Sequence, residues 1–138
     1  MPDAVVMFAT IIVLLPMGYF LLAAPAFLLV RLDIPSVAQL LRAMFNGYFL
    51  TMIATGVIGT LAVAAAGRLV VAISVGLIAA FAVSARRWFL QRMDAQLRAG
   101  DPDAAHRLRR LHWGGMLCNA ILVVATVGSI PYIMVTPT

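Results

Sequence analysis

The chain has 138 residues, of which 64% are hydrophobic and 11% are charged, and its mean hydropathy is +1.04. A soluble domain carries about 25% charged and 45–50% apolar residues, so this composition indicates a membrane protein and excludes disordered, fibrous and disulfide-framework classes. The net charge of +5 comes from ten arginines and five aspartates; because the arginines flank apolar runs, we expect them to bind anionic lipid head groups and not nucleic acid.

Four apolar runs predict an all-α integral membrane four-helix bundle that forms one domain over residues 1–138. The spans cover about residues 4–30, 43–66, 69–90 and 111–135, and a span needs roughly 20 residues. The first run is long, so we expect a tilt, or a bend at Pro16 or Pro25. A cleaved signal peptide is the alternative for this run, because residues 24–26 resemble a cleavage site. The run exceeds a signal core of about 7–15 residues, and we interpret it as a span.

Local motifs mark the helix boundaries. Ser36 and Gln39 form a capping-box pattern, which predicts that the second helix begins at Ser36. Gly67 permits a tight turn between the second and third helices. The pattern Gly100-Asp101-Pro102 predicts that the third helix stops at Gly100 and that the fourth begins with Asp101 as its N-cap and Pro102 in its first turn.

Charged residues near these boundaries predict ion pairs within single helices. Asp94 with Arg98, and Asp103 with Arg107, are four residues apart. Such pairs lie on one helix face and contribute a few tenths of a kcal/mol each.

The arginines are distributed unevenly between the two ends of the predicted bundle. Nine lie in or beside the connections after the first and third spans, and only Arg68 lies at the opposite end. The positive-inside rule then places both termini on the extracytoplasmic side and the Arg-rich hairpin 86–110 in the cytoplasm. We expect the protein in the cell inner (plasma) membrane. The hairpin is a candidate binding site for anionic head groups or an acidic partner. Alternatively, its arginines serve only to orient the protein in the membrane.

Small residues recur four apart on the second and third predicted helices, and such residues allow close packing in lipid. We expect the two ridges to face each other across the Gly67 turn, although small residues are common throughout this Ala-rich chain. The ridges are Gly47, Thr51, Thr55 and Gly59, with Gly56, Thr60 and Ala64 beside them, and Ala72, Gly76, Ala80 and Ser84.

One polar line follows the fourth predicted helix, where His112 and Asn119 are seven residues apart and therefore share a face. An amide at the depth of Asn119 needs a hydrogen-bond partner inside the bundle. We predict a polar pocket between the second and fourth helices that opens to the cytoplasm, with His112 as its titratable member. Alternatively, Asn119 only joins helices and His112 marks the membrane interface. The candidate ligand-binding residues are His112, Asn119, Arg109, Asn46, Tyr48 and Thr51.

Other chemistry finds little support in the residues. No charged residue lies in the middle of a span, as a proton-coupled carrier would need. His106 and His112 are about 240° apart around a helix, so they cannot share a metal ion. Haem ligation by His112 with a methionine carries little specificity, and we expect neither a metal nor a cofactor.

The segment Arg110 to Asn119, RLHWGGMLCN, resembles the R-x-H and L-x-N pattern that begins the last membrane helix in the anthrone-oxygenase-like family. Residues 16–26, followed by a short connection and an amphipathic stretch over 39–48, are similar in style. The resemblance implies a four-helix membrane fold and, for some members, cofactor-free oxidation of a polycyclic phenol. It points to His112 and Asn119.

Two functions follow as hypotheses, and whether the protein is an enzyme stays open. The first is binding of a hydrophobic aromatic or quinone-like molecule near His112 and Asn119. The second is a non-enzymatic accessory subunit that packs against a larger membrane complex or forms a homo-oligomer, through its small-residue ridges or its Arg-rich hairpin.

Overall fold

A computed structural model describes residues 4–29, 34–99 and 101–133, and these form a bundle of four α-helices. The elements are α1 (Ala4–Ala23), a 3-10 helix η1 (Ala24–Leu28), α2 (Pro35–Ala65), α3 (Leu69–Ala99) and α4 (Ala104–Ile133). All four helices, α1 together with most of η1, are long and apolar enough to cross a membrane. The predicted all-α fold with four spans is confirmed.

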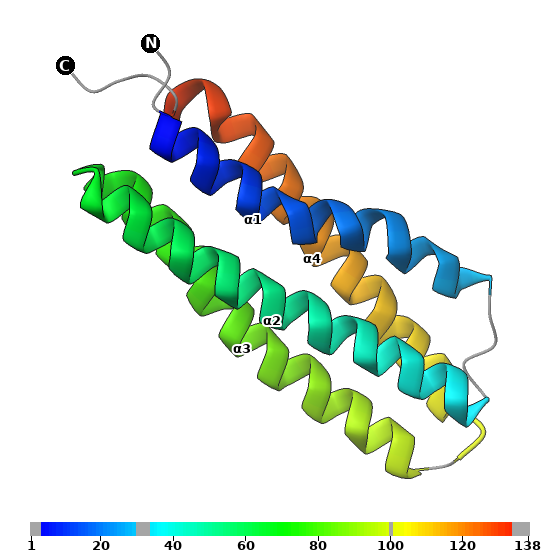
Figure 1. Cartoon of the computed structure of the whole chain (residues 1–138). Helices are drawn as coiled ribbons and strands as arrows, with labels where there is room; N and C mark the ends of the chain where they lie inside the picture. The colour runs from blue at the N-terminus through cyan, green and yellow to red at the C-terminus, as the bar shows by residue number, and fades with distance from the viewer. Residues whose placement is uncertain (1–3, 30–33, 100, 134–138) are drawn as a thin grey trace.

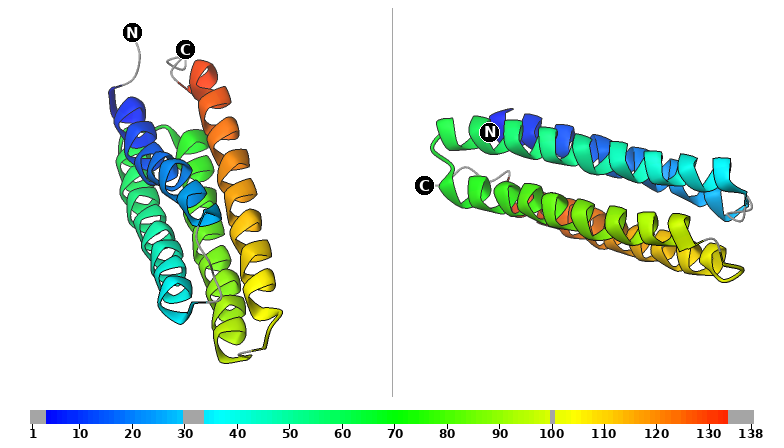
Figure 2. Two further views of the ribbon diagram at one scale, coloured as in Figure 1. Left: turned by 90° about the vertical axis from the view of Figure 1, so that its right-hand side faces the viewer. Right: turned by 90° about the horizontal axis from the view of Figure 1, so that it is seen from below.

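The helices run antiparallel to one another along the chain (Figure 1). α1 packs against α2 and α4, and α3 packs against the same two helices. Figure 2 shows the pair α1 and α2 lying over the pair α3 and α4. The ends of α1 and α4 nearest the termini lie together with the α2–α3 turn, and the two Arg-rich connections lie at the opposite end.

Large apolar side chains cover the outside of the bundle. Leu22 is 83% exposed, Val124 is 71% exposed and Leu61 is 66% exposed. A soluble protein does not leave so much contiguous apolar surface in water. The outer surface therefore matches the hydrocarbon of a bilayer.

α3 and α4 extend well beyond the predicted spans at the Arg-rich end. α3 has 31 residues, a length of about 46 Å at 1.5 Å per residue, against a hydrocarbon core of about 30 Å. The Arg-rich hairpin 86–110 is thus largely helical, and its arginines are carried on α3 and α4.

The start of α2 differs from the capping-box prediction, which is wrong. The helix begins at Pro35 with Ile34 as its N-cap, and no side chain caps it. Pro35 suits the first helical position because its missing N–H would have no partner there. Ser36 therefore lies inside the first turn and not before it.

Proline and glycine shape the other boundaries largely as predicted. Pro16 stays within α1, whereas the α-helix gives way to η1 next to Pro25, because proline has no N–H for an α-helical bond. Gly67 ends the α2–α3 turn with a φ of +81°, a conformation that glycine adopts without strain.

Both predicted intrahelical ion pairs are replaced by other pairs. Asp94 binds Arg42 of α2, with oxygen–nitrogen distances of 2.5 and 3.3 Å. Arg107 binds both carboxylate oxygens of Asp101 at 2.7 Å and donates to Gln96 of α3. Arg42 binds Asp94 through two nitrogens, Nε and Nη2, in the paired geometry that a guanidinium group favours, whereas Arg107 binds both oxygens of Asp101 from Nη2.

Asp101 lies three residues before Ala104, the first residue of α4, and Pro102 lies in the turn between them, so the predicted N-cap and first-turn positions differ from the structure. Its carboxylate accepts a hydrogen bond from the Asp103 N–H at 3.1 Å. The hydrogen bonds from Arg107 hold the pKa of Asp101 below its usual range. The exposed carboxylate thus stays charged near the N-terminus of α4, where negative charge is favoured.

The small-residue ridges face each other only in part. A Cβ on Gly56 would lie 2.8 Å from the Cβ of Ala79, and one on Gly76 would lie 3.6 Å from the Thr60 methyl group. α2 and α3 form the most extensive helix pair because these small residues let their backbones approach. Gly47, Thr51, Ala80 and Ser84 lie on exposed faces instead.

Candidate functional site

A hydrogen-bond network crosses the middle of the bundle from α4 to α2 and α1. The Tyr48 hydroxyl donates to Asn119 Oδ1 at 2.8 Å, and Asn119 Nδ2 donates to the Met17 carbonyl at 3.1 Å. All three residues are buried. The amide at this depth therefore has the interior partner that the sequence predicts, and the network fixes α4 against two other helices.

His112 lies one heptad away from Asn119 but in very different surroundings. Its side chain is completely buried, and neither ring nitrogen has a hydrogen-bond partner among the described residues. The Ala24 carbonyl lies close by without the geometry of a full hydrogen bond. Phe27 and Phe45 flank the imidazole, with ring centroids at 6.1 and 6.2 Å.

A cluster of five buried aromatic rings occupies the space between His112 and Asn119. We call it the aromatic cluster. Its centre is Phe45, whose ring lies 5.2 Å from that of Phe20 and 5.6 Å from that of Phe89. The members are Phe20, Phe45, Tyr48, Phe49 and Phe89. Stacked and edge-on rings of this kind stabilise one another beyond simple burial.

α4 reaches the aromatic cluster through Gly115. A Cβ at this position would overlap the Phe45 ring and come within 3.6 Å of the Phe20 ring. No spacing pattern predicted above involves this contact. The pair Gly114-Gly115 beside His112 is the signal that would have indicated it, because adjacent glycines in a helix often permit a close approach.

Two of the other predicted residues, Asn46 and Thr51, have partners other than His112 and Asn119, whereas Arg109 lies near enough to His112 for its charge to act on the imidazole. Asn46 accepts a hydrogen bond from Arg86 of α3 at 3.1 Å. Thr51 is exposed, and its hydroxyl donates to the Gly47 carbonyl of its own helix. Arg109 is half-buried one turn before His112 and interacts with other residues of the protein. The structure thus joins Tyr48 to Asn119 but not Asn46 or Thr51.

Phe45 and Tyr48 of the aromatic cluster lie on the inner face of α2, where the pocket toward α4 is predicted, and three cavities border neighbouring pairs of helices. A cavity of about 260 Å³ lies between α1 and α4, and its wall includes Phe20, Ala24, Pro25, Trp113 and Asn119. A second, of about 760 Å³, separates α3 from α4. A third, of about 360 Å³, lies between α1 and α2 and is bordered by Tyr48 and Thr51.

The cavity between α1 and α4 adjoins the buried histidine through Ala24. Ala24 lines it, and the carbonyl of the same residue lies beside the imidazole. Phe20 also lines it and belongs to the aromatic cluster. Ala24 and Phe20 therefore lie between this cavity and the site around His112.

Among the residues that the structure describes, no three histidine, cysteine or acidic side chains come together as metal ligands. His106 is exposed whereas His112 is buried, so the two histidines have separate environments.

Comparisons with known proteins do not assign the chain to a family. No protein-family model matches it, and neither does any curated protein or solved structure. The similarity to the anthrone-oxygenase-like family, carried by residues 110–119, therefore stays a hypothesis.

Proposed function

We propose that this protein binds a hydrophobic aromatic molecule of the quinone or phenol type beside His112, within the membrane. The proposal rests on the buried imidazole, which has no hydrogen-bond partner among the described residues. A buried polar group without a partner costs about 1–3 kcal/mol. A ligand that supplies the missing partners recovers this free energy on binding.

The chemistry of the site favours a ligand with oxygen substituents on an aromatic ring. A neutral imidazole offers one N–H donor and one nitrogen acceptor. A quinone carbonyl accepts a hydrogen bond, and a phenol or quinol hydroxyl donates one. Phe27 and Phe45 beside the imidazole provide faces and edges against which a flat ring packs.

The cavity between α1 and α4 supplies a route for such a ligand from the lipid. Its wall is almost entirely apolar apart from Asn119. The wall nearest His112 includes the start of η1, where 3-10 hydrogen bonds are weaker than α-helical ones and Pro25 offers no donor. A small displacement of η1 therefore opens the cavity toward the imidazole. The similarity over residues 110–119 supports a phenolic ligand for the same histidine.

Fluorescence of Trp113 tests the proposal directly. The chain has two tryptophans, and Trp113 lines the cavity between α1 and α4. In a Trp88→Phe background, a short-chain benzoquinone should quench Trp113 with a saturable dependence on concentration. Replacing His112 by Leu should weaken this binding about tenfold, the value of one lost hydrogen bond of about 1.4 kcal/mol.

The other histidine provides the matched control. His106→Leu removes an exposed imidazole of the same helix and should leave quenching unchanged. His112→Leu should keep the melting temperature of the protein close to its original value, because the imidazole makes no hydrogen bond that Leu would lose. Quenching that does not saturate, or equal loss in both variants, contradicts the proposal; a His112→Leu protein that no longer folds assigns His112 a structural role.

An accessory-subunit role is the second candidate. Gly47 and Thr51 lie on an exposed face of α2, and no atom lies within 4 Å of a Cβ built on Gly47. Small residues left open in this way allow another transmembrane helix to approach closely. The two candidates differ in what purifies with the protein in a mild detergent, which mass spectrometry identifies as either a small aromatic compound or a protein subunit.

A further inference from the structure

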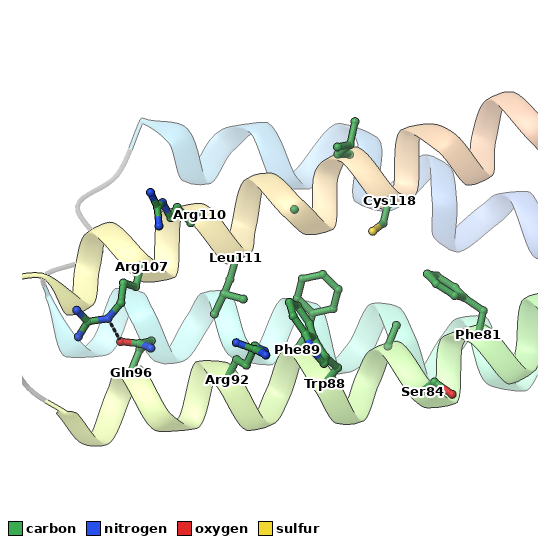
Figure 3. A pocket seen from close by; sticks show the side chains of 13 residues that line it. Phe81, Ser84, Trp88, Phe89, Arg92, Gln96, Arg107, Arg110, Leu111 and Cys118 are labelled. Carbon is green, nitrogen blue, oxygen red and sulfur yellow. Dashed lines mark hydrogen bonds between the residues drawn. The ribbon is translucent and has the colours of Figure 1, made fainter.

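The groove between α3 and α4 has two chemically different halves. Near the Arg-rich connection its wall is polar and carries Arg92, Gln96, Arg107 and Arg110. Further from the connection the wall is apolar, and it includes Phe81, Trp88, Leu111, Leu117 and Cys118. Figure 3 shows Arg92 and Arg107 extending into the space between the helices, with Phe81 and Cys118 at the far end.

Arginines at this groove carry positive charge that the described protein does not neutralise. Arg107 is paired with Asp101, and Asp94 is paired with Arg42. Arg92 lies 4.3 Å from the centre of the Trp88 ring, and neither it nor Arg110 forms an ion pair within the described residues. In Figure 3 Arg92 lies in the space between the helices, whereas Arg110 extends from the far side of α4 and would turn toward the groove to bind the same anion.

The depth of the groove matches one leaflet of a bilayer. Phe81 lies eleven residues before Arg92 on α3, a distance of about 16 Å along the helix. Half of the hydrocarbon core measures about 15 Å. A chain that starts at Arg92 and follows the groove to Phe81 thus spans the acyl region of one leaflet.

We propose that this groove binds one anionic phospholipid of the surrounding membrane, with its phosphate at Arg92 and Arg110 and an acyl chain along Trp88, Leu117 and Phe81. Guanidinium groups bind phosphate oxygens with paired hydrogen bonds. The apolar half of the groove favours a lipid over free phosphate as the ligand, because a hydrated ion would not occupy an apolar space. A net negative head group is favoured over a zwitterionic one because the cluster of arginines repels a choline ammonium.

The bound lipid has a structural role in this arrangement. α3 and α4 share far less contact than α2 and α3, and the groove of about 760 Å³ separates them. A lipid chain in the groove fills that space, and its phosphate links an arginine of each helix. The site differs from the one proposed beside His112 in its second helix, α3 instead of α1, although Leu117 of α4 borders both cavities.

Trp88 reports on occupation of the groove. In a Trp113→Phe background, the protein is placed in neutral phosphatidylcholine vesicles that contain a small fraction of phosphatidylglycerol with brominated acyl chains, which quench tryptophan on contact. We expect stronger quenching than with the same fraction of brominated phosphatidylcholine. Arg92→Gln or Arg110→Gln should each lower the apparent affinity for the anionic lipid about fivefold.

Arg87→Gln is the matched control, since Arg87 is exposed on α3 about 140° around the helix from Arg92. It should preserve the preference for the anionic lipid. Equal quenching by the two brominated lipids in the Trp113→Phe protein overturns the proposal without any arginine variant. An equal loss for Arg87→Gln and Arg92→Gln also overturns it, because the preference would then reflect general surface charge. Displacement of the brominated lipid by millimolar inorganic phosphate contradicts a lipid-specific site.

Discussion

Asn119 and His112 show how two buried polar side chains on one helix face differ in what they contribute. Asn119 donates to Met17 and accepts from Tyr48, so its amide is satisfied and joins three helices. His112 has no such partner among the described residues. In a membrane interior, a satisfied amide stabilises the fold, whereas an unsatisfied imidazole is available to a ligand.

A double-mutant cycle on Tyr48 and Asn119 measures the first of these contributions. We expect Tyr48→Phe and Asn119→Leu to be coupled by about 0.6 kcal/mol, and by no more than about 1.7 kcal/mol, in the free energy of unfolding. Reversible unfolding in mixed detergent micelles gives these values. Tyr19→Phe is the control, because Tyr19 is 61% exposed and should show no coupling to Asn119. Zero coupling between Tyr48 and Asn119 would contradict the role assigned to their hydrogen bond.

The sequence predicts the positions of these residues only where their spacing along a helix determines which face they share. A separation of seven places His112 and Asn119 on one face, and the need of a buried amide for a partner correctly points to the second helix. The sequence groups Asn46 and Thr51 with Tyr48 in one predicted pocket because α2 is apolar on nearly all of its faces. Such a helix carries no amphipathic signal from which its rotation can be read, so the partners of Asn46 and Thr51 were not predictable.

At the level of elements, α4 is the helix held least firmly by the others. Only 11% of its most apolar window is buried, against 33% or more for the other three helices. Its buried residues lie along one face from Ala104 to Asn119, and Gly115 on this face lies against Phe45. The close approach at Gly115 is one of the contacts, with the hydrogen bonds of Asn119, that attach α4 to the bundle.

Comparing Gly115→Ala with Gly114→Ala distinguishes the effect of this contact on stability from the effect of higher helix propensity. The first places a methyl group against the buried Phe45 ring and should destabilise the protein by about 1–3 kcal/mol. The second meets only the Phe89 ring, at 3.8 Å, and should be neutral or stabilising by up to about 1 kcal/mol. Thermal unfolding in detergent compares the two variants. Similar stability for both would show that α4 does not depend on Gly115.

Element boundaries were predictable where chain geometry fixes them. Gly67 at positive φ and the change to η1 beside Pro25 follow from properties of single residues. The capping box at Ser36 and the ion pairs of Asp94 and Arg107 were not predictable in the same way. Their outcome depends on a neighbouring residue such as Pro35, or on a partner from another helix such as Arg42, which local spacing does not reveal.

At the scale of the whole molecule, α4 separates two cavities of different chemistry. The cavity toward α1 is small and apolar and adjoins the buried His112. The groove toward α3 is larger and ends in arginines. Each contains one of the two tryptophans. This division makes the two proposals separable by experiment, because either site can be observed without the other.

Orientation in the membrane follows from the arrangement of arginines. The described arginines, except Arg68, lie on the half of the bundle that holds the 29–34 and 99–104 connections, opposite the chain ends (Figure 1). The positive-inside rule then predicts that these connections face the cytoplasm and that both termini face outward. The anionic lipid of the α3–α4 groove would accordingly come from the cytoplasmic leaflet.

Cysteine labelling tests this orientation, since Cys118 is the only cysteine of the chain. In a Cys118→Ala background, Thr136→Cys should react with a membrane-impermeant maleimide in intact cells, whereas Asp103→Cys, in the connection before α4, should react only after permeabilisation. The opposite labelling pattern would show an inverted protein. It would place the arginines of the groove in the outer leaflet, against the electrostatic preference that anionic cytoplasmic lipids impose on basic residues.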